Sequence, residues 1–382
     1  MIYFDNASTT FPKPEVVYQE MDLWLRRQNV NPSRGTYQSA ILATDKVFET
    51  RKRLATLFNV HNPLQIVFTS NGTEALNLAL KGILKPGDHV ITTSMEHNSM
   101  IRPIMKLAET GVEYTIVPAN QLGLIHPDQI KEAIRQNTKL IAMTHASNVT
   151  GTIQPITEIG YLAKEHEILF LVDAAQTAGV YPIDVKKMNI DLLAAPGHKG
   201  LMGPQGTGLL YIKEGISLQP LKEGGTGNQS EYLQQPQTMP ECYESGTLNT
   251  PGIVGLGAGV GFILEIGVKQ ILVHKQQLTA YFLEGLYQLP IKIVGQPQLG
   301  VISLQLQGLE PSDLGYLLDE AFKIATRTGL HCAPLAHQTL ETKKTGTVRF
   351  SFGYFNTIHE VDIALEALQK ICKMIFSDNH FE

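Results

Sequence analysis

The chain alternates between short apolar runs and longer segments in which apolar residues recur every three to four positions. From Gln65 onward the short runs are IVFTS, HVITTS, VEYTIV, KLIAMTHAS and ILFLVDAAQ. Such runs predict buried strands, and the segments between them, such as EALNLALKGIL, have helical spacing. Repeated strand–helix units with fully apolar strands predict a mostly parallel sheet that helices cover on both faces.

The residues before this alternation predict a short strand and two helices. YFDNASTT begins like a strand and ends in a polar turn, and a helix follows over residues 14–28 with Pro14 in its first turn. NPSRG is a loop, and apolar residues at helical spacing predict a helix over residues 39–58.

The pattern changes after about residue 214. Residues 218–237 are rich in Gly and Gln and predict a long loop, and a long helix is expected to open with Pro251, with Thr250 or Asn249 as its cap. The later strands are short (IKIV, VISLQL and VRFSF), and helices are expected over residues 311–320 and 359–376. We therefore expect a large domain over residues 13–250 and a smaller α+β domain made of residues 1–12 and 251–382.

Composition narrows the class of protein. The 382 residues suffice for two domains, and 43% hydrophobic with 18% charged residues is typical of a globular protein. A net charge of −5 without a basic run argues against nucleic acid as a partner, and the apolar stretches are too short for a membrane span. The start lacks a signal peptide, and the 3 cysteines lack metal-ligand spacing, so we expect a cytoplasmic protein.

The first candidate for chemistry is Lys199, in the stretch DLLAAPGHKGLMGPQGTGLLY. Two apolar runs, 192–195 and 208–212, predict buried strands that flank a Gly/Pro-rich loop carrying this lysine. Open α/β sheets bind ligands at such strand ends. A lysine there is paired, deprotonated or covalently used, or else it is an ordinary loop lysine that points to solvent.

Other polar residues follow other strands. Gly72 and Thr73 begin a helix, which makes either a phosphate seat or a plain helix cap. His97 follows HVITTS and either stacks on a planar ring or is a loop histidine, and Asn148 is a candidate donor to a ring substituent.

Asp173 and Gln176 follow the apolar run ILFLV. An acid at the end of a buried strand needs a cation, which is a salt-bridge partner or a protonated pyridine nitrogen. A lysine, such an aspartate, a phosphate seat and a stacking ring together predict a pyridoxal phosphate (PLP) site, in which Lys199 forms the Schiff base. The histidines are scattered without ligand spacing, so we predict no metal site.

The run GLGAGVG at residues 255–261 imitates a dinucleotide-binding motif. Val260 stands where that motif needs Gly or Ala, and a helix rather than a strand precedes the run. We interpret it as close helix packing, which removes the case for a nicotinamide-dependent enzyme.

Several motifs spread over the whole chain point to one family. They are YFDNASTT, NPSRG, TSNGTEALNL, MEHNS, HASNVTG, VDAAQ, GHKGLMGPQGTG, ESGTLNT, RTGLHCAP and VRFSFGYFNT. With them the chain resembles the class V aminotransferase-fold enzymes of the cysteine desulfurase / selenocysteine lyase family. The resemblance implies PLP-dependent transferase fold type I, an α/β fold with a mostly parallel, seven-stranded type of sheet and a smaller α+β C-terminal domain. It also implies a homodimer with PLP at the subunit interface.

The resemblance assigns roles to single residues. Lys199, His97 and Cys332 would be catalytic. The cofactor would contact Gly72, Thr73, His97, Asn148, Asp173, Gln176, His198 and Lys199, and Thr247 would reach the phosphate bound by the neighbouring subunit. Arg349, with Asn148 and Arg327, would bind the substrate, because a guanidinium fork fits a carboxylate better than a lysine does.

Cys332 lies in RTGLHCAP, and the family uses a loop cysteine to take the substrate sulfur as a persulfide. This needs a thiolate, which His331 and Arg327 are expected to favour, whereas the alternative is a small buried hydrophobe. The motif resembles the second group of the family, which has a short cysteine loop. Leu330 and Pro196 depart from it, at positions where relatives have a histidine and a phosphate-binding serine. We interpret Cys372 and Cys242 as structural, although Cys242 could also be exposed.

We therefore expect a PLP-dependent cysteine desulfurase that converts L-cysteine to L-alanine and passes the persulfide sulfur to a protein or thiol acceptor. One alternative is a selenocysteine lyase. Another is a class V PLP enzyme, such as a cysteine β-lyase or an aminotransferase, that does not use Cys332. A third is a non-catalytic partner protein. Iron–sulfur cluster assembly is one pathway that such an enzyme serves.

Overall fold

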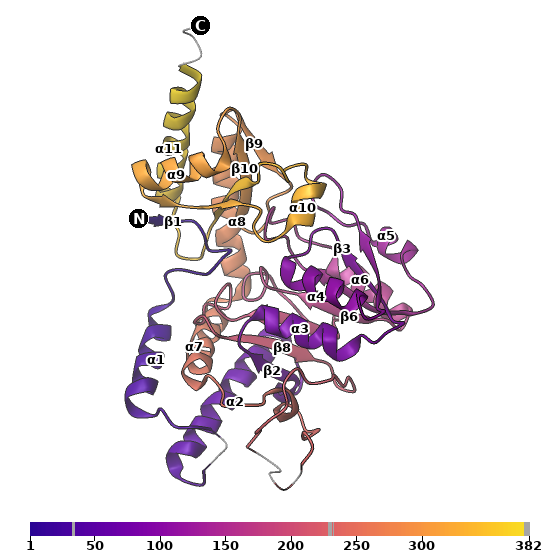
Figure 1. Cartoon of the computed structure of the whole chain (residues 1–382). Coiled ribbons are helices and arrows are strands. Elements are labelled where there is room, and N and C mark those ends of the chain that lie inside the picture. Colours follow the sequence, from indigo (N-terminus) through magenta and orange to yellow (C-terminus); the bar gives the residue numbers. More distant parts are fainter. Residues whose placement is uncertain (33–34, 228–230, 232, 378–382) are drawn as a thin grey trace.

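A computed structural model describes residues 1–32, 35–227, 231 and 233–377 (Figure 1). The predicted loops NPSRG and 218–237 lie partly outside these residues. The chain forms two packed units, and the long helix α8 (Val268–Leu286) runs from the larger unit into the smaller one (Figure 1). The C-terminal helix α11 (Ile358–Ser377) lies in the smaller unit, beside α8.

The larger unit is built on a seven-stranded sheet with the order β2-β8-β7-β6-β5-β3-β4. Its strands are β2 (Ile66–Thr69), β3 (His89–Thr93), β4 (Glu113–Val117), β5 (Thr138–Thr144), β6 (Leu169–Asp173), β7 (Leu192–Pro196) and β8 (Gly208–Ile212). Only β8 runs antiparallel to its neighbours, because the short Gly/Pro-rich loop after β7 returns the chain directly, whereas a parallel return needs a long crossover. The predicted mostly parallel sheet is confirmed.

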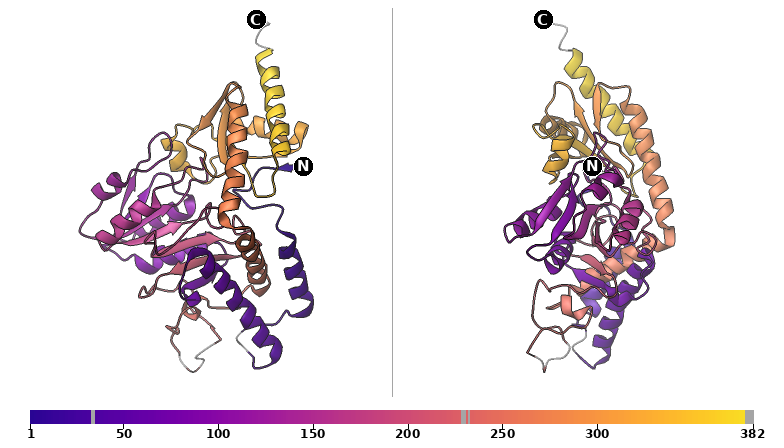
Figure 2. Two further views of the ribbon diagram at one scale, coloured as in Figure 1. Left: turned by 180° about the vertical axis from the view of Figure 1, so that it is seen from behind. Right: turned by 90° about the vertical axis from the view of Figure 1, so that its right-hand side faces the viewer.

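Helices cover both faces of this sheet (Figure 1 and Figure 2). On strand β6, Leu171 packs with α3 and α4, while Phe170 and Val172 pack with α2, α5, α6 and α7 on the other face. This alternation follows from the two-residue period of a strand. The helices of the larger unit are α1 (Glu15–Arg27), α2 (Gln38–Phe58), α3 (Gly72–Ile83), α4 (Asn98–Ala108), α5 (Pro127–Glu132), α6 (Ile156–Glu165) and α7 (Thr250–Ile266), with short 3-10 turns at Pro63–Gln65 and Glu241–Tyr243.

The smaller unit has an antiparallel sheet with the order β12-β13-β10-β9 and its own apolar core. Its other elements are α8, α9 (Pro311–Phe322), α10 (Pro334–Thr339) and α11, and its strands are β9 (Ile291–Val294), β10 (Val301–Leu306), β12 (Arg327–Gly329) and β13 (Thr347–Ser351). The N-terminal strand β1 (Ile2–Tyr3) pairs with β11 (Ile324–Ala325), and Phe4 is fully buried in this core. The N-terminal segment thus lies against the smaller unit and crosses toward the larger one.

The predicted long helix that opens with Pro251 is confirmed as α7, and Asn249 caps it. The chain then bends by 81° between α7 and α8. The bend falls at Gly267, whose φ of 90° is a conformation that glycine adopts without strain. Because α7 packs into the core of the larger unit, the division between the two cores falls inside α8, whereas the predicted domain boundary lies at residue 251.

The glycine run in α7 serves close packing. A Cβ at Gly257 would lie 2.3 Å from Thr50 Oγ1 on α2, and one at Gly259 would lie 2.7 Å from the Leu201 carbonyl oxygen. The interpretation as close helix packing is confirmed. No single helix in the described part of the chain is long and apolar enough to cross a membrane, and α7 with α8 would qualify only as a bent pair.

Candidate active site

The carboxyl ends of the parallel strands surround a cavity of about 190 Å³. Its walls contain the following predicted cofactor contacts: Gly72, Thr73, His97, Asn148, Asp173, Gln176, His198 and Lys199. Of the predicted contacts, only Thr247 is missing from these walls. It is an exposed residue in the loop before α7.

One end of the cavity is the N-terminus of α3. Asn71 caps this helix by accepting a hydrogen bond from Glu74 N at 2.8 Å. Gly72 lies against Pro196, since an added Cβ would be 3.1 Å from Pro196 Cδ. The hydroxyl of Thr73 lies 2.7 Å from that of Ser99. Backbone N–H groups, two hydroxyls and the positive end of a helix make this end suitable for a phosphate.

His97 is the N-cap of α4, and its ring lies in the cavity wall. The backbone N–H of Ser99 donates to His97 Nδ1 at 3.1 Å, so Nδ1 carries no proton. Burial, together with the positive charges of Lys199 and Arg327, lowers the pKa of His97 to about 4. The ring is therefore neutral at physiological pH, which suits stacking on another planar ring.

Asp173 ends strand β6 and is buried. Its Oδ1 accepts a hydrogen bond from Ala175 N at 2.9 Å, and it forms no ion pair with any residue that the structure describes. Burial raises the pKa of Asp173 above its ordinary value, while the hydrogen bond and Lys199 oppose this shift. A cation placed beside this carboxyl would offset its desolvation.

Lys199 follows β7 and is partly buried in the cavity wall. Burial lowers the pKa of Lys199 to about 8, although Asp173 favours its charged form. A larger fraction of its amine is therefore neutral near physiological pH than in an ordinary lysine, as a nucleophilic lysine requires. Burial also lowers the pKa of His198 to about 4, and its Nδ1 has no partner among the described residues.

Arg349 is 1% exposed and lies beside the cavity. Its Nη1 donates to the carbonyl oxygen of Asn148 at 3.0 Å, and its Nη2 donates to Asp5 Oδ1 at 2.7 Å and Ser8 Oγ at 2.9 Å. Its Nε is buried without a partner in the described structure. A buried donor of this kind is available to a ligand carboxylate.

Cys332 is exposed on a short loop between β12 and α10, with a φ of 57°. Its sulfur lies 3.5 Å from Arg327 Nη2, and its carbonyl oxygen accepts a hydrogen bond from Asn98 N at 2.8 Å. Asn148 Nδ2 donates to the carbonyl oxygen of His331 at 2.7 Å. These bonds hold the cysteine loop beside the cavity and place the Arg327 guanidinium next to the sulfur.

The expected role of His331 in forming the thiolate is wrong. His331 is buried, its Nε2 lies 2.8 Å from Thr347 Oγ1, and burial lowers its pKa to about 2. A neutral ring bonded elsewhere brings no positive charge to Cys332. Cys242 and Cys372 are both buried, as expected of structural residues.

Sequence reasoning missed four residues of this region. Asp5 and Ser8 bind the arginines, Ser99 lies at the phosphate end, and Glu96 lies directly before His97. Glu96 is fully buried, and its Oε1 accepts from Thr93 Oγ1 at 2.5 Å and Thr144 N at 3.0 Å. Burial raises its pKa to about 8. A glutamate within an apolar strand end was the one signal that could have identified it.

Residues 2–364 match the family model aminotransferase class-V. The chain belongs to the class V aminotransferase family. Its relatives within that family include proteins named as cysteine desulfurases. A probable cysteine desulfurase of Methanothermobacter thermautotrophicus is 37% identical over 382 residues, covering 98% of this chain and 95% of the relative. The cysteine desulfurase of Escherichia coli O7:K1 is 33% identical over 389 residues, covering 98% and 94%.

Solved structures agree with this class V assignment. The apo cysteine desulfurase of Thermococcus onnurineus superposes with a TM-score of 0.92 at 35% identity, covering 97% of this chain and 94% of that chain. An Escherichia coli cysteine desulfurase with an S-sulfonic acid superposes with a TM-score of 0.89 at 28% identity, covering 98% and 95%. The predicted recognition of the cysteine desulfurase family is confirmed. The predicted loop subgroup stays a prediction.

Class V enzymes depend on PLP in general, and the residues of this cavity fit that group. Asp173 is a buried carboxyl that has no ion-pair partner in the described part of the chain, and a protonated ring nitrogen would supply one. The start of α3 and the Thr73 and Ser99 hydroxyls suit a phosphate, and Lys199 lies in the same walls. Pro196 stands where a serine is expected, but the Ser99 hydroxyl lies at this end of the cavity instead.

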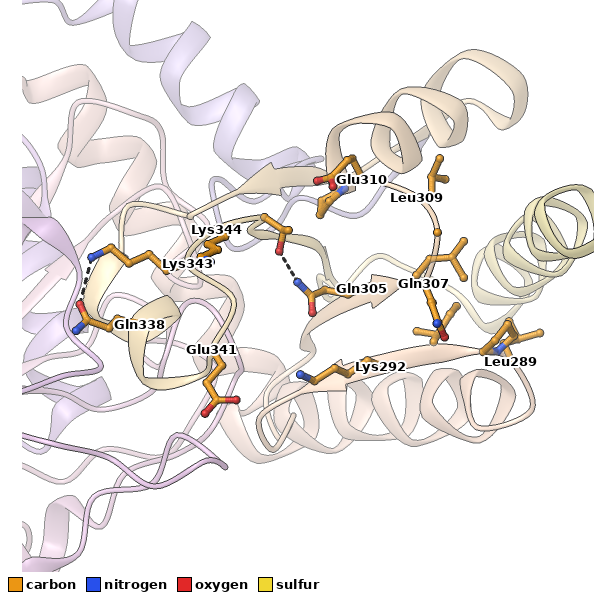
Figure 3. Close-up of a pocket in the computed structure, with 16 residues that line it drawn as sticks. Leu289, Lys292, Gln305, Gln307, Leu309, Glu310, Gln338, Glu341, Lys343 and Lys344 are labelled. Atoms are coloured by element: carbon orange, nitrogen blue, oxygen red, sulfur yellow. Dashed lines mark hydrogen bonds between the residues drawn. The ribbon is translucent and has the colours of Figure 1, made fainter. Parts of the chain in front are cut away.

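A larger cavity, of about 1240 Å³, lies in the smaller unit (Figure 3). Lys292, Gln305, Glu310, Glu341 and Lys344 are among the residues that line it (Figure 3). It contains none of the predicted site residues, so size alone does not identify the active site of this class V enzyme.

Proposed function

We propose that the protein is a PLP-dependent cysteine desulfurase, which converts L-cysteine to L-alanine and takes the sulfur on Cys332 as a persulfide. The observation that carries this proposal is the position of Cys332. Its thiol is exposed beside Arg327, and its backbone is bonded to Asn98, the residue after the cavity histidine His97. A lyase or aminotransferase that does not use Cys332 would have no need of this arrangement.

Bound PLP supplies an electron sink for the pair of electrons left when the substrate loses its α-proton. Lys199 would hold it covalently, and Asp173 would keep its ring nitrogen protonated. His97 would lie against the ring, Gln176 would contact the ring oxygen, and the phosphate would be held at the N-terminus of α3 with help from Thr73 and His198. Thr247 would contribute to the site of the neighbouring subunit in a homodimer.

The substrate is held by its carboxylate. Arg349 is the buried guanidinium of the site, and its Nε is the donor without a partner in the described chain. The Arg349 fork is kept in place by the Asn148 carbonyl and by Asp5. Lys199 Nζ would take the α-proton of the bound substrate, and its lowered pKa of about 8 lets it accept and return a proton near neutral pH.

Sulfur transfer then needs no further oxidant or reductant, although it depends on the electron sink that bound PLP would supply. The thiolate of Cys332 attacks the substrate sulfur, so that a sulfur–sulfur bond forms while the bond between sulfur and Cβ breaks. The electron pair of the broken bond stays with carbon, which takes up a proton to become the methyl group of alanine. Arg327 stabilises the attacking thiolate, and a protein or a small thiol removes the sulfur from the exposed residue.

The identity of the products tests this proposal. Protein loaded with PLP is given L-cysteine, and alanine, pyruvate and free sulfide are measured with and without a thiol acceptor. We expect alanine, with sulfide release that depends on the acceptor. Pyruvate with stoichiometric free sulfide would instead indicate a cysteine β-lyase. Selenocysteine measured beside cysteine would decide between a desulfurase and a selenocysteine lyase. The homodimer and the cytoplasmic location stay predictions, and light scattering would test the first.

A further inference from the structure

Two guanidinium groups of the site meet at a single hydroxyl of the N-terminal segment. Arg349 Nη2 donates to Ser8 Oγ at 2.9 Å, and Arg327 Nη1 donates to the same oxygen at 3.0 Å. Ser8 Oγ in turn donates to Asp5 Oδ1 at 2.8 Å. Asp5 also accepts directly from Arg349 Nη2 at 2.7 Å. Residues from both ends of the chain thus share one hydrogen-bond network.

The Ser8 hydroxyl uses its whole bonding capacity here. A serine hydroxyl has one hydrogen to donate and two lone pairs to accept with. Both lone pairs receive N–H groups from arginines, so the hydrogen must point to Asp5. The hydroxyl therefore has one fixed orientation, and it separates two like charges that would otherwise repel. Burial lowers the pKa of Arg349, the charge of Arg327 lowers it further, and Asp5 opposes the shift.

Beyond this network, each arginine has N–H groups that face a different part of the site. Arg327 Nη2 lies 3.5 Å from the Cys332 sulfur. Arg349 faces the cavity side through its contact with Asn148, and its Nε has no partner within the described residues. Asn148 lines the cavity. Arg327 is therefore placed to interact with the thiolate of Cys332, and Arg349 is placed to interact with the carboxylate of an amino acid.

We propose that Ser8 is a positioning residue that assigns the two guanidinium groups to two anions, Arg327 to the Cys332 thiolate and Arg349 to the substrate carboxylate, with Asp5 fixing the direction of its hydroxyl. The carboxylate half of this assignment rests on the proposed function. The Cys332 half does not, because it concerns a thiol and a cation that are both part of this chain.

The test measures the reactivity of Cys332 in the absence of substrate. PLP-loaded wild type, Ser8→Ala, Ser8→Thr and Arg327→Gln are treated with iodoacetamide at pH 7, and alkylation of the Cys332 peptide is followed by mass spectrometry. An exposed ion pair of this kind shifts an equilibrium by about 1.4- to 5-fold. We expect alkylation to slow by about 2- to 5-fold in Arg327→Gln and by a similar or smaller factor in Ser8→Ala. Ser8→Thr keeps the hydroxyl and should restore the wild-type rate.

The pH dependence separates positioning from general damage. At pH 10, above the ordinary pKa of a cysteine thiol, the alkylation rates should converge. Equal rates for Ser8→Ala and wild type at pH 7 would overturn the proposal, as would a Ser8→Ala defect that persists at pH 10. If Ser8→Ala does not fold, Arg327→Gln and Ser8→Thr still test the proposal. Unchanged alkylation in Arg327→Gln would show that Arg327 does not act on the Cys332 thiolate.

Steady-state kinetics with L-cysteine test the second half. Ser8→Ala should raise the KM about 2- to 5-fold, since Arg349 keeps Asp5 and Asn148 but loses one orienting contact. An unchanged KM would overturn the carboxylate assignment. If wild type itself forms no alanine, the proposed function fails, while the alkylation result still stands or falls on its own.

Discussion

The cavity and the cysteine loop are built in opposite ways. His97, Asp173 and Lys199 lie at the ends of buried strands, and burial is the largest cause of the shifted pKa of each. Cys332 is exposed on a short loop of the smaller unit, on backbone of positive φ, and few hydrogen bonds hold it. Groups that tune a cofactor need a low dielectric, whereas a group that hands sulfur to another molecule must stay accessible.

The largest effect is expected on the cavity side. If Lys199 has its proposed roles, replacing it with Ala removes both the covalent link to the cofactor and the base at the α-carbon, so turnover of L-cysteine should fall on the order of 10³-fold or more. Borohydride should then no longer fix the cofactor to the protein, as mass spectrometry would show. Wild-type turnover in this variant would contradict the assignment of Lys199.

Cys332→Ala tests the cysteine loop, the second of the two regions compared. Alanine formation from L-cysteine should fall by roughly two orders of magnitude, because the sulfur has no nucleophile to accept it. The absorbance of bound PLP should stay that of wild type, since the cavity does not depend on this side chain. Cys372→Ala, which removes a buried cysteine, is the matched control and should keep turnover. A spectrum changed as much as the rate would mean that the two regions are not separate.

The pH dependence of cofactor uptake tests the burial of Lys199. Its amine must be neutral to react, and burial lowers its pKa to about 8. Uptake of PLP by the cofactor-free protein should therefore rise about 5-fold between pH 7 and 8 and level off above pH 9. Stopped-flow absorbance would show this. A rate that keeps rising toward pH 10 would indicate an ordinary, solvated lysine.

The smallest effect is expected for Glu96→Gln. Burial raises the pKa of Glu96 to about 8, so its carboxyl is protonated at pH 7 and a neutral amide replaces it with little change. Turnover should stay within about 2-fold of wild type. Glu96→Ala, which leaves Thr144 N and Thr93 Oγ1 without their acceptor, should lower the melting temperature. A loss of activity in Glu96→Gln alone would show that Glu96 acts as an anion.

The sequence predicted the sheet and the cavity well, because both follow from local pattern. Fully apolar strands leave few choices of topology, and polar residues directly after them, such as Asp173 and Asn148, must gather at the carboxyl edge. The start of α7 was predicted, but the bend at Gly267 was not, although a glycine inside a helical pattern is a signal for it.

The cysteine loop and its arginines were harder to predict. Ser8 is 319 residues from Arg327 along the chain, and the sequence around either residue does not predict their contact. The role of His331 was predicted wrongly because neighbouring residues in a loop can point in opposite directions, and only packing decides that His331 is buried while Cys332 is exposed.

The central claim is that sulfur leaves the buried cavity on the exposed Cys332. The most direct measurement is a single turnover of PLP-loaded protein with one equivalent of L-cysteine, followed by rapid quenching, trapping of persulfides and mass analysis of the peptides. The account predicts one added sulfur on the Cys332 peptide, appearing together with one alanine. Alanine formed without sulfur on Cys332, or sulfur found on the Cys242 or Cys372 peptide, would contradict it.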